Sequence, residues 1–263
     1  MKISLNFFPT FHFTLFLLCL ISINSTAANA KFFEVYIDLN PPYSTSVHSK
    51  RGLFSEIIDE ALTAGNIPHH FLLKGDRIKN YNIHNHDRLL LFYYFRTPER
   101  ENNYNWIMPL FDDYTCLFNL RTSKEISSIN ALKGLSRIGT INGGAGESIL
   151  KSFGLEGQIY YCRDEDSCID RLRKNEVDAW ITQKIKANYF LKKYKIQNEL
   201  NNYFQIYDSQ GWLASSLNLT QSDIDLLRKT LRKFMTTSKF LAILKKYDAI
   251  MTSNTDEFKD IYH

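Results

Sequence analysis

The chain has 263 residues, 44% of them hydrophobic and 14% aromatic, and it carries 32 basic and 28 acidic residues for a formal net charge of +4. This length allows one large domain or two ordinary ones. The small net charge argues neither for nor against nucleic acid. Because no dense run of Lys and Arg of the kind that follows phosphates is present, we expect no nucleic-acid partner.

The first 30 residues have the pattern of a secretory signal peptide. One early lysine precedes an apolar core, and the segment ends in STAANA, with small residues at Ala28 and Ala30. This pattern predicts export and cleavage after Ala30. A membrane anchor is the alternative, but the most apolar stretch, residues 13–23, is short for a membrane span. Cys19 is a poor lipid-attachment site, because Leu18 precedes it. We therefore expect a mature protein that is periplasmic and has no membrane span.

The predicted mature chain contains three cysteines, Cys116, Cys162 and Cys168. The last two lie close together in YCRDEDSC, and an oxidising compartment permits a disulfide between them. Cys116 would remain as a small buried hydrophobic residue. No pair of Cys-x-x-Cys motifs of the zinc-binding type is present, and the sequence indicates no cofactor.

Along the chain, short runs rich in β-branched and aromatic residues alternate with helical patterns, which predicts an α/β fold with largely parallel sheets. The predicted strands are residues 32–39, 69–74, 88–95, 113–121, 137–142, 158–163, 179–183 and 204–209. The predicted helices are residues 52–65, 146–153, 167–175, 185–194, 221–235 and 238–248.

The stretch FRTPEREN (95–102) places two arginines, Arg96 and Arg100, around a predicted helix start. Thr97 is suited to cap this helix, and Pro98 fits the first helical position. One interpretation is a solvated helix cap. The other is a site that binds a carboxylate through a guanidinium group.

The stretch NGGAGES (142–148) follows a predicted strand and opens a predicted helix. Unpaired backbone N–H groups at such a helix start favour an anion. The stretch lacks the Lys-Ser/Thr of a P-loop and the full dinucleotide-binding fingerprint. A tight strand-to-helix turn remains the alternative interpretation, and a carboxylate is a better guest than a nucleotide for an exported protein.

Two further groups of residues are candidate functional sites. His69, His70, His84 and His86 form a histidine-rich set of the kind that can bind metal. Because His69 and His70 would point to opposite faces of a strand, we expect no metal site. The acidic residues 164–166 are interpreted as a helix cap and a solvated turn.

Several motifs occur in a characteristic order: NPPYS, GLFSEIIDEAL, RTPEREN followed by WIMPL, LKGLSRIGTINGGAGE, LRKNEVDAWITQ and SKFLAILKKYDAI. Together with the signal peptide, this order resembles the polar-amino-acid branch of the bacterial periplasmic solute-binding proteins, extracellular family 3. The resemblance implies a two-lobed α/β fold of type II with the ligand in a cleft between the lobes. It divides the chain into a signal peptide (1–30), the first part of lobe one (31–119), lobe two (120–213) and a C-terminal return to lobe one (214–263).

The same resemblance assigns ligand-binding roles. The motif arginine that binds a ligand carboxylate corresponds to Arg100, which can give two parallel charge-assisted hydrogen bonds. The second-lobe loop whose amides meet the same carboxylate corresponds to Gly144, Ala145 and Gly146. An aromatic lining position corresponds to Tyr43. Tyr93 and Phe95 fall where relatives often carry small polar residues.

One departure from the family pattern concerns the ligand ammonium group. Relatives that bind α-amino acids usually carry an aspartate at the position of Gln183, and glutamine supplies no charge. The carboxylate half of the site is therefore retained and the ammonium half is not, which favours an aromatic or apolar carboxylate over a typical amino acid.

These patterns predict a monomeric, non-enzymatic binding protein that captures a small carboxylate for an inner-membrane ABC transporter or a sensor. Two alternatives remain open. One is an enzyme on the same scaffold, similar to the dehydratases of cyclic prephenate-like acids. The other is a secreted interaction protein that has lost its ligand.

Overall fold

The structure is a computed structural model that describes residues 32–46, 51–73, 86–94, 96 and 98–252, without the side chains of residues 92–94, 98 and 99. The predicted signal peptide, Cys19, Phe95, Thr97 and His84 lie outside the described residues. The described chain from Phe32 onward forms one compact unit, so the predicted lobe boundaries stay a prediction. Within the described ranges, no helix combines the length and the apolar character that crossing a membrane requires.

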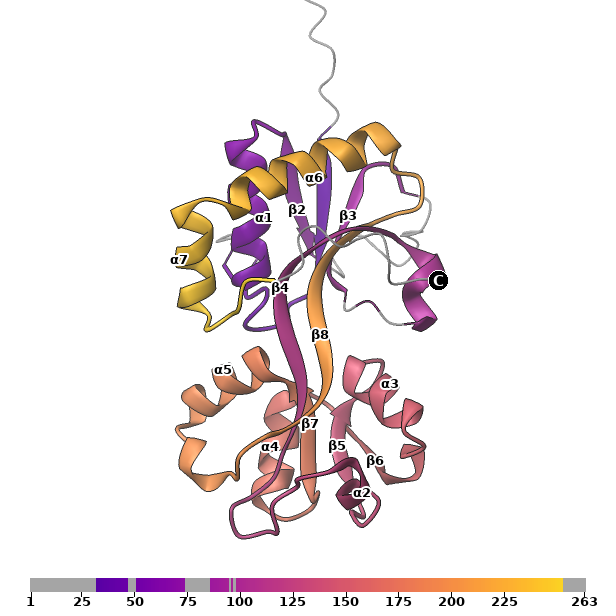
Figure 1. Ribbon diagram of the computed structural model, residues 1–263, viewed down its shortest axis with the longest axis vertical. Helices are drawn as coiled ribbons and strands as arrows, with labels where there is room; N and C mark the ends of the chain where they lie inside the picture. The colour runs from indigo at the N-terminus through magenta and orange to yellow at the C-terminus, as the bar shows by residue number, and fades with distance from the viewer. Residues whose placement is uncertain (1–31, 47–50, 74–85, 95, 97, 253–263) are drawn as a thin grey trace, which may run out of the picture. The chain divides into compact units, whose positions relative to one another are not determined.

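Eight strands form one sheet in the order β2-β1-β3-β8-β4-β7-β5-β6 (Figure 1). Their bounds are β1 Phe33–Ile37, β2 His69–Leu73, β3 Leu89–Tyr94, β4 Asn105–Phe118, β5 Ile138–Ile141, β6 Ile159–Cys162, β7 Ala179–Gln183 and β8 Phe204–Ser215.

The prediction of largely parallel sheets is wrong for the centre of this sheet. The pairs β1–β2, β1–β3, β5–β6 and β5–β7 are parallel, whereas β3–β8, β4–β8 and β4–β7 are antiparallel. The reason is that β4 and β8 are much longer than predicted and run side by side in opposite directions between the two parallel groups (Figure 1).

Helices flank both parallel groups of strands, and their bounds are α1 Leu53–Ala64, α2 Ile129–Leu132, α3 Ala145–Ser152, α4 Glu165–Arg173, α5 Lys184–Tyr194, α6 Gln221–Met235 and α7 Ser238–Lys246. Short 3-10 helices are η2 Pro98–Asn103, η3 Glu156–Gln158 and η4 Gln197–Glu199. Side-chain caps start several of the helices: Thr220 accepts the Asp223 N–H at α6, and Thr237 accepts the Phe240 N–H at α7.

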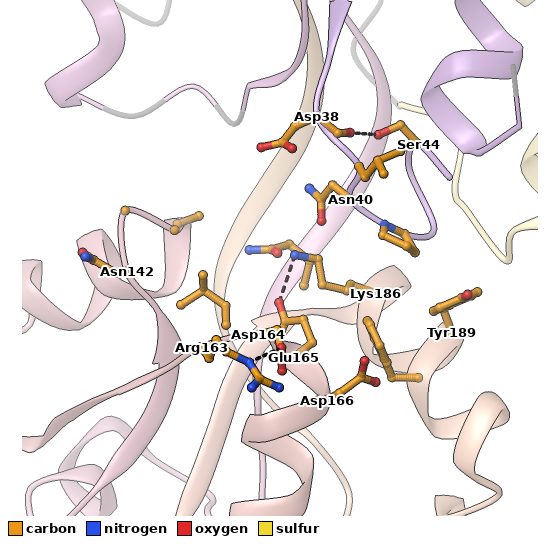
Figure 2. Close-up of a pocket in the computed structure, with 18 of the residues that line it drawn as sticks. Asp38, Asn40, Ser44, Asn142, Arg163, Asp164, Glu165, Asp166, Lys186 and Tyr189 are labelled. Atoms are coloured by element: carbon orange, nitrogen blue, oxygen red, sulfur yellow. Dashed lines mark hydrogen bonds and ion pairs between the residues drawn. The ribbon is translucent and has the colours of Figure 1, made fainter. Parts of the chain in front are cut away.

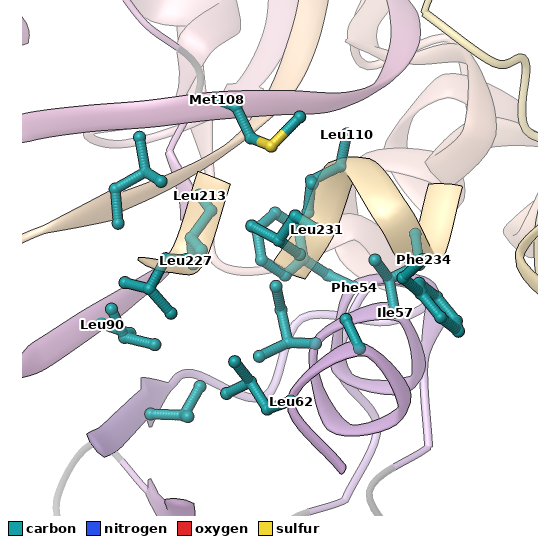
Figure 3. Close-up of a cluster of buried hydrophobic side chains, with 14 of the residues drawn as sticks. Phe54, Ile57, Leu62, Leu90, Met108, Leu110, Leu213, Leu227, Leu231 and Phe234 are labelled. Atoms are coloured by element: carbon teal, nitrogen blue, oxygen red, sulfur yellow. The ribbon is translucent and has the colours of Figure 1, made fainter. Parts of the chain in front are cut away.

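The buried apolar side chains form separate clusters along the shared strands. The largest cluster, called here the first core, joins β1, α1, α6 and α7 with the beginning of β4 and the end of β8. Figure 3 shows Phe54 of α1 beside Leu231 of α6, and Ile57 of α1 beside Phe234 of α6, in this cluster. Two further clusters, called here the second and third cores, consist of residues in the sequence range 116–206. Ile185 of α5 belongs to the first core although its helix follows β7.

Candidate functional site

A pocket of about 700 Å³ lies where the turn after β1, the η2 segment, the β5–α3 loop and the starts of α4 and α5 come together (Figure 2). It is lined by Tyr36, Asp38, Leu39, Asn40, Pro41, Ser44, Arg100, Ile141, Asn142, Gly143, Gly144, Ala145, Arg163, Asp164, Glu165, Asp166, Gln183, Lys186, Tyr189, Phe190 and Lys193.

One wall of the pocket is the turn that follows β1. The Asn40 N–H donates to the Ser44 carbonyl at 2.9 Å, and the Tyr43 N–H donates to the Asn40 carbonyl at 2.9 Å. The Ser44 hydroxyl donates to the Asp38 carbonyl, so the backbone of the turn is closed on itself (Figure 2). These bonds place the Asp38 and Asn40 side chains at the pocket.

Arg100 lines the pocket from η2, and its Nη2 atom donates to the Gly143 carbonyl at 3.1 Å. The guanidinium group therefore connects η2 to the loop that precedes α3. This contact brings together Arg100, Gly144 and Ala145, which the sequence assigned to one carboxylate site.

The β5–α3 loop uses some of its amides internally. The Gly144 N–H donates to the Ile141 carbonyl at 3.0 Å, and the Gly143 N–H donates to Glu147 Oε2 at 2.6 Å. Hydrogen bonding from Lys151 lowers the pKa of Glu147, so this carboxylate is ionised beside the loop. The N–H groups of the first α3 turn, which begins at Ala145, have no acceptor within the helix itself.

Gly146 is not among the lining residues. A Cβ atom there would lie 2.7 Å from Thr140 Oγ1 and 3.0 Å from Ile181 Cγ2. Glycine at this position therefore lets α3 pack closely on β5 and β7.

The opposite wall carries acidic residues at the start of α4. As predicted, Asp164 is a helix cap: it accepts the Ser167 N–H, and the Ser167 hydroxyl completes a capping box. Glu165 is different, because it accepts hydrogen bonds from Trp180 Nε1 at 2.9 Å and Thr182 Oγ1 at 3.3 Å and forms an ion pair with Lys186 at 3.0 Å. The interpretation of all three acidic residues as a cap and solvated turn is therefore wrong for Glu165, whose side chain is 12% exposed.

The disulfide predicted between Cys162 and Cys168 is present, with the two Cα atoms 5.4 Å apart. Cys162 ends β6 and Cys168 lies in α4, so the bond closes the loop that carries Arg163, Asp164, Glu165 and Asp166. Cys116 is a free and buried thiol. Burial raises the pKa of this thiol to about 12.

Gln183 is the last residue of β7 and occupies the N-cap position of α5. It lines the pocket, and only 5% of its surface is exposed. Three residues later, Lys186 also lines the pocket. The sequence analysis missed Lys186 and interpreted Glu165 as part of a cap and solvated turn. Their only signal was position, since each lies in the first turn of a helix that follows a strand of the predicted parallel group.

Tyr43 does not line the pocket, in contrast to the expectation from the resemblance. It is fully buried in the first core, and its hydroxyl donates to Asp113 Oδ2 at 2.5 Å. The physical reason is that its ring stacks on Phe111, with the ring centroids 6.1 Å apart. Asp113 in β4 is 1% exposed and also accepts the Ile185 N–H at 3.2 Å. Burial raises the pKa of Asp113 to about 6.

Three predicted or neighbouring positions remain, Tyr93, Phe95 and Arg96. The backbone of Tyr93 lies in β3, but its side chain is outside the described residues, as is all of Phe95. Arg96 pairs with Glu101, with Nε 2.7 Å from Oε2. Its guanidinium carbon lies 4.9 Å from the centroid of the Trp212 ring, so Arg96 is a half-buried packing residue.

The histidines among the described residues contact single acids. His69 Nε2 lies 2.9 Å from Asp59 Oδ1, and His86 Nε2 lies 3.2 Å from Glu34 Oε2. In the part of the chain that the structure describes, no three His, Cys, Asp or Glu side chains are grouped to hold a metal ion.

No known protein family matches the sequence, and no curated protein does. Solved structures with a similar fold are numerous. A histidine kinase sensor domain with similarity to periplasmic binding proteins is 14% identical, with a TM-score of 0.72 over 84% of this chain and 98% of that chain. A substrate-binding protein of an ABC uptake transporter from Streptococcus pneumoniae, with bound histidine, is 13% identical, with a TM-score of 0.68 over 86% of this chain and 96% of that one.

A third similar structure is the arginine-, lysine-, histidine-binding protein ArtJ from Geobacillus stearothermophilus, which is 20% identical, with a TM-score of 0.64 over 82% of this chain and 95% of that one. Identities this low establish the fold alone. They confirm the predicted fold class: the chain has the two-lobed α/β fold of the periplasmic binding proteins.

Proposed function

We propose that the protein is a periplasmic solute-binding protein that captures a small carboxylate-bearing solute, either an amino acid or a related acid. The observation that carries the proposal is the position of Arg100, whose guanidinium group lines the pocket and reaches the loop at the start of α3. A guanidinium group binds a carboxylate with two parallel hydrogen bonds. The first-turn amides of α3, next to this loop, favour the same negative charge.

The similar solved structures support a role in binding rather than in chemistry. Two of them are described as proteins that bind histidine, or arginine, lysine and histidine, and one as a sensor domain of a histidine kinase. By analogy, we propose that the protein acts as a monomer. It would deliver its ligand to an inner-membrane ABC transporter or signal through a sensor partner.

The enzyme alternative requires a carboxyl group that exchanges a proton with substrate. Of the pocket acids, Glu165 is held by Lys186, Trp180 and Thr182. These three donors already occupy this carboxylate. We therefore propose binding as the function, with enzymatic activity or loss of ligand binding as the competing hypotheses.

The proposal can be tested with a panel of carboxylates. Thermal shift identifies the compounds that bind, and titration calorimetry then measures their affinities. A ligand that binds the folded state raises the melting temperature. Replacing Arg100→Ala should then weaken binding of the best acid by about 2–5 kcal/mol, and Arg100→Lys should recover only part of that loss, because the fork geometry is absent.

Arg163→Ala is the matched control. Arg163 also lines the pocket, but its side chain is 85% exposed and pairs with the neighbouring Asp164, so its removal should change affinity far less than the removal of Arg100. If Arg100→Ala binds as well as the unchanged protein, the FRTPEREN stretch serves only as a helix start, and the proposal is wrong.

A further inference from the structure

A buried ion pair forms part of the pocket wall between α4 and α5. Lys186 Nζ lies 3.0 Å from Glu165 Oε1, and the two side chains are 10% and 12% exposed. Trp180 and Thr182 donate to the same carboxylate, which fixes its orientation. Figure 2 shows the Lys186 side chain extending from α5 into the pocket toward Glu165.

The other ion pairs on this wall are more exposed. The side chains of Arg163 and Asp164 are 85% and 43% exposed, and those of Lys193 and Asp166 are 44% and 48% exposed. Solvent screens such pairs strongly, whereas a buried pair is screened much less. A ligand group on this wall therefore interacts most strongly with the charges of Lys186 and Glu165.

This pair determines which ligand group fits beside it. An ammonium group of a ligand would meet the positive charge of Lys186, while the negative charge of Glu165 is already compensated by that lysine. A lysine ammonium has three N–H donors, and the hydrogen bond to Glu165 uses one of them. Gln183, which lines the same part of the pocket, contributes an amide and no charge.

From this arrangement we infer that Lys186 is a specificity-determining residue, which donates to an acceptor group of the ligand and excludes an amino group. The ligand class is then a small acid with a further acceptor, such as a second carboxylate, a keto group or a hydroxyl group, and without an α-amino group. The inference rests on the proposed function, because it assumes that Arg100 binds a carboxylate at the other end of the ligand.

Matched pairs of compounds that differ only in the amino group test this inference: succinate and aspartate, glutarate and glutamate, 3-phenylpropionate and phenylalanine. Titration calorimetry gives the ratio of the two dissociation constants for each pair that binds. The unchanged protein should prefer the acid without the amino group by roughly tenfold or more, the scale of one hydrogen bond to a charged group.

Two substitutions should shift this ratio in opposite directions. Lys186→Met leaves Glu165 as a carboxylate without its lysine, so the ratio should move toward the amino acid by roughly tenfold or more. Glu165→Gln removes the compensating charge from Lys186, so the ratio should move further toward the plain acid. Lys192→Met is the control, because Lys192 is not among the lining residues and its pair with Asp248 is exposed, so the ratio should stay within about twofold.

Removing one partner of a buried pair also destabilises the fold, so each variant is checked by its melting temperature. The double variant Lys186→Met with Glu165→Gln, which leaves no unpaired charge, should give a ratio between those of the two single variants and serves if either of them fails to fold.

The outcomes separate this inference from the proposed function. If an acid binds and depends on Arg100, but the ratio is the same in all of these variants, the inference is wrong and the proposed function stands. A preference of the unchanged protein for the amino acid of each pair also overturns the inference. If no member of any pair binds but another acid of the carboxylate panel does, the inference is wrong and the proposed function stands.

Discussion

The apolar side chains on the two sides of the pocket are organised differently. On the side of β1, one large core combines α1, α6 and α7, and a small cluster of Tyr36, Leu89, Leu91 and Ala214 lies apart from it. On the other side, alternate residues of β7 belong to different clusters: Trp180 lies in the second core, whereas Ala179 and Ile181 lie in the third. Because successive strand residues face opposite sides of a sheet, this half has two thinner apolar layers.

The half with the divided apolar layers also contains a disulfide and a buried ion pair. The disulfide joins Cys162 to Cys168, and the ion pair joins Glu165 to Lys186. Gly139 of β5 is part of the same arrangement, since a Cβ atom there would lie 3.2 Å from both disulfide sulfur atoms. The pocket wall built by α4 and α5 is thus fixed by covalent and ionic contacts, and the first core is fixed by packing.

The largest expected effect comes from weakening the first core. Phe54 is fully buried there, and Phe54→Ala should lower the free energy of unfolding by about 3–5 kcal/mol through lost transfer energy and a residual cavity. Phe118→Ala in the second core should cost less, because that layer is thinner. Chemical denaturation of both variants measures the difference, and a larger loss for Phe118→Ala would contradict the comparison.

The next effect concerns Asp113, where the two sides meet. Its carboxyl group accepts hydrogen bonds from the Tyr43 hydroxyl and the Ile185 N–H. Burial raises its pKa from 3.8 to about 6. Because the folded state holds the proton more tightly than the unfolded state, the stability contribution is complete below pH 3.8 and is lost as the pH rises to about 6.

This loss amounts to about 3 kcal/mol, at roughly 1.36 kcal/mol for each pKa unit. The asparagine variant Asp113→Asn should lack this part of the pH dependence. The free energy of unfolding, measured between acidic and neutral pH for both proteins, tests the expectation. Parallel pH profiles would show that Asp113 titrates in the folded protein as it does in the unfolded chain.

A smaller effect is expected from the disulfide. Replacing both Cys162 and Cys168 with serine should lower the free energy of unfolding by roughly 2–3 kcal/mol, since the bond closes a short loop. Because that loop carries Glu165, the double variant should also bind a ligand more weakly. The control is Cys116→Ala, which keeps the bond. Peptide mapping without reductant that finds free thiols at both Cys162 and Cys168 would refute the expectation.

Much of the fold follows from local sequence patterns. The strand at residues 179–183 and the helix at residues 221–235 have the predicted bounds. The two long strands were predicted too short because each contains a residue that disfavours a strand, Pro109 in β4 and Gly211 in β8. In the structure, the β4–β8 register shifts beside Pro109, and Gly211 leaves room for the Phe111 ring.

The candidate site was predicted in part. Arg100, Gly144, Ala145 and Gln183 all line the pocket, because each lies at or after the end of a strand, at the edge where such sheets bind ligands. Tyr43 was expected at the pocket but lies in the core. An aromatic residue after a strand can face either one, and the contact that holds Tyr43 in the core is with Asp113, which is distant in sequence. The pairing of Glu165 with Lys186 joins two helices and has no local sequence signal.

The burial of Cys116 has a practical consequence for thiol-directed labelling. Two cysteines of the described residues are joined in the disulfide, and the third has no exposed surface and a pKa of about 12. The thiolate is the nucleophile that attacks a maleimide, so Cys116 should stay unmodified in the folded protein. A cysteine introduced at Tyr189, which lines the pocket and is 37% exposed, would then be the reactive thiol of the described residues and would carry a fluorophore beside the pocket.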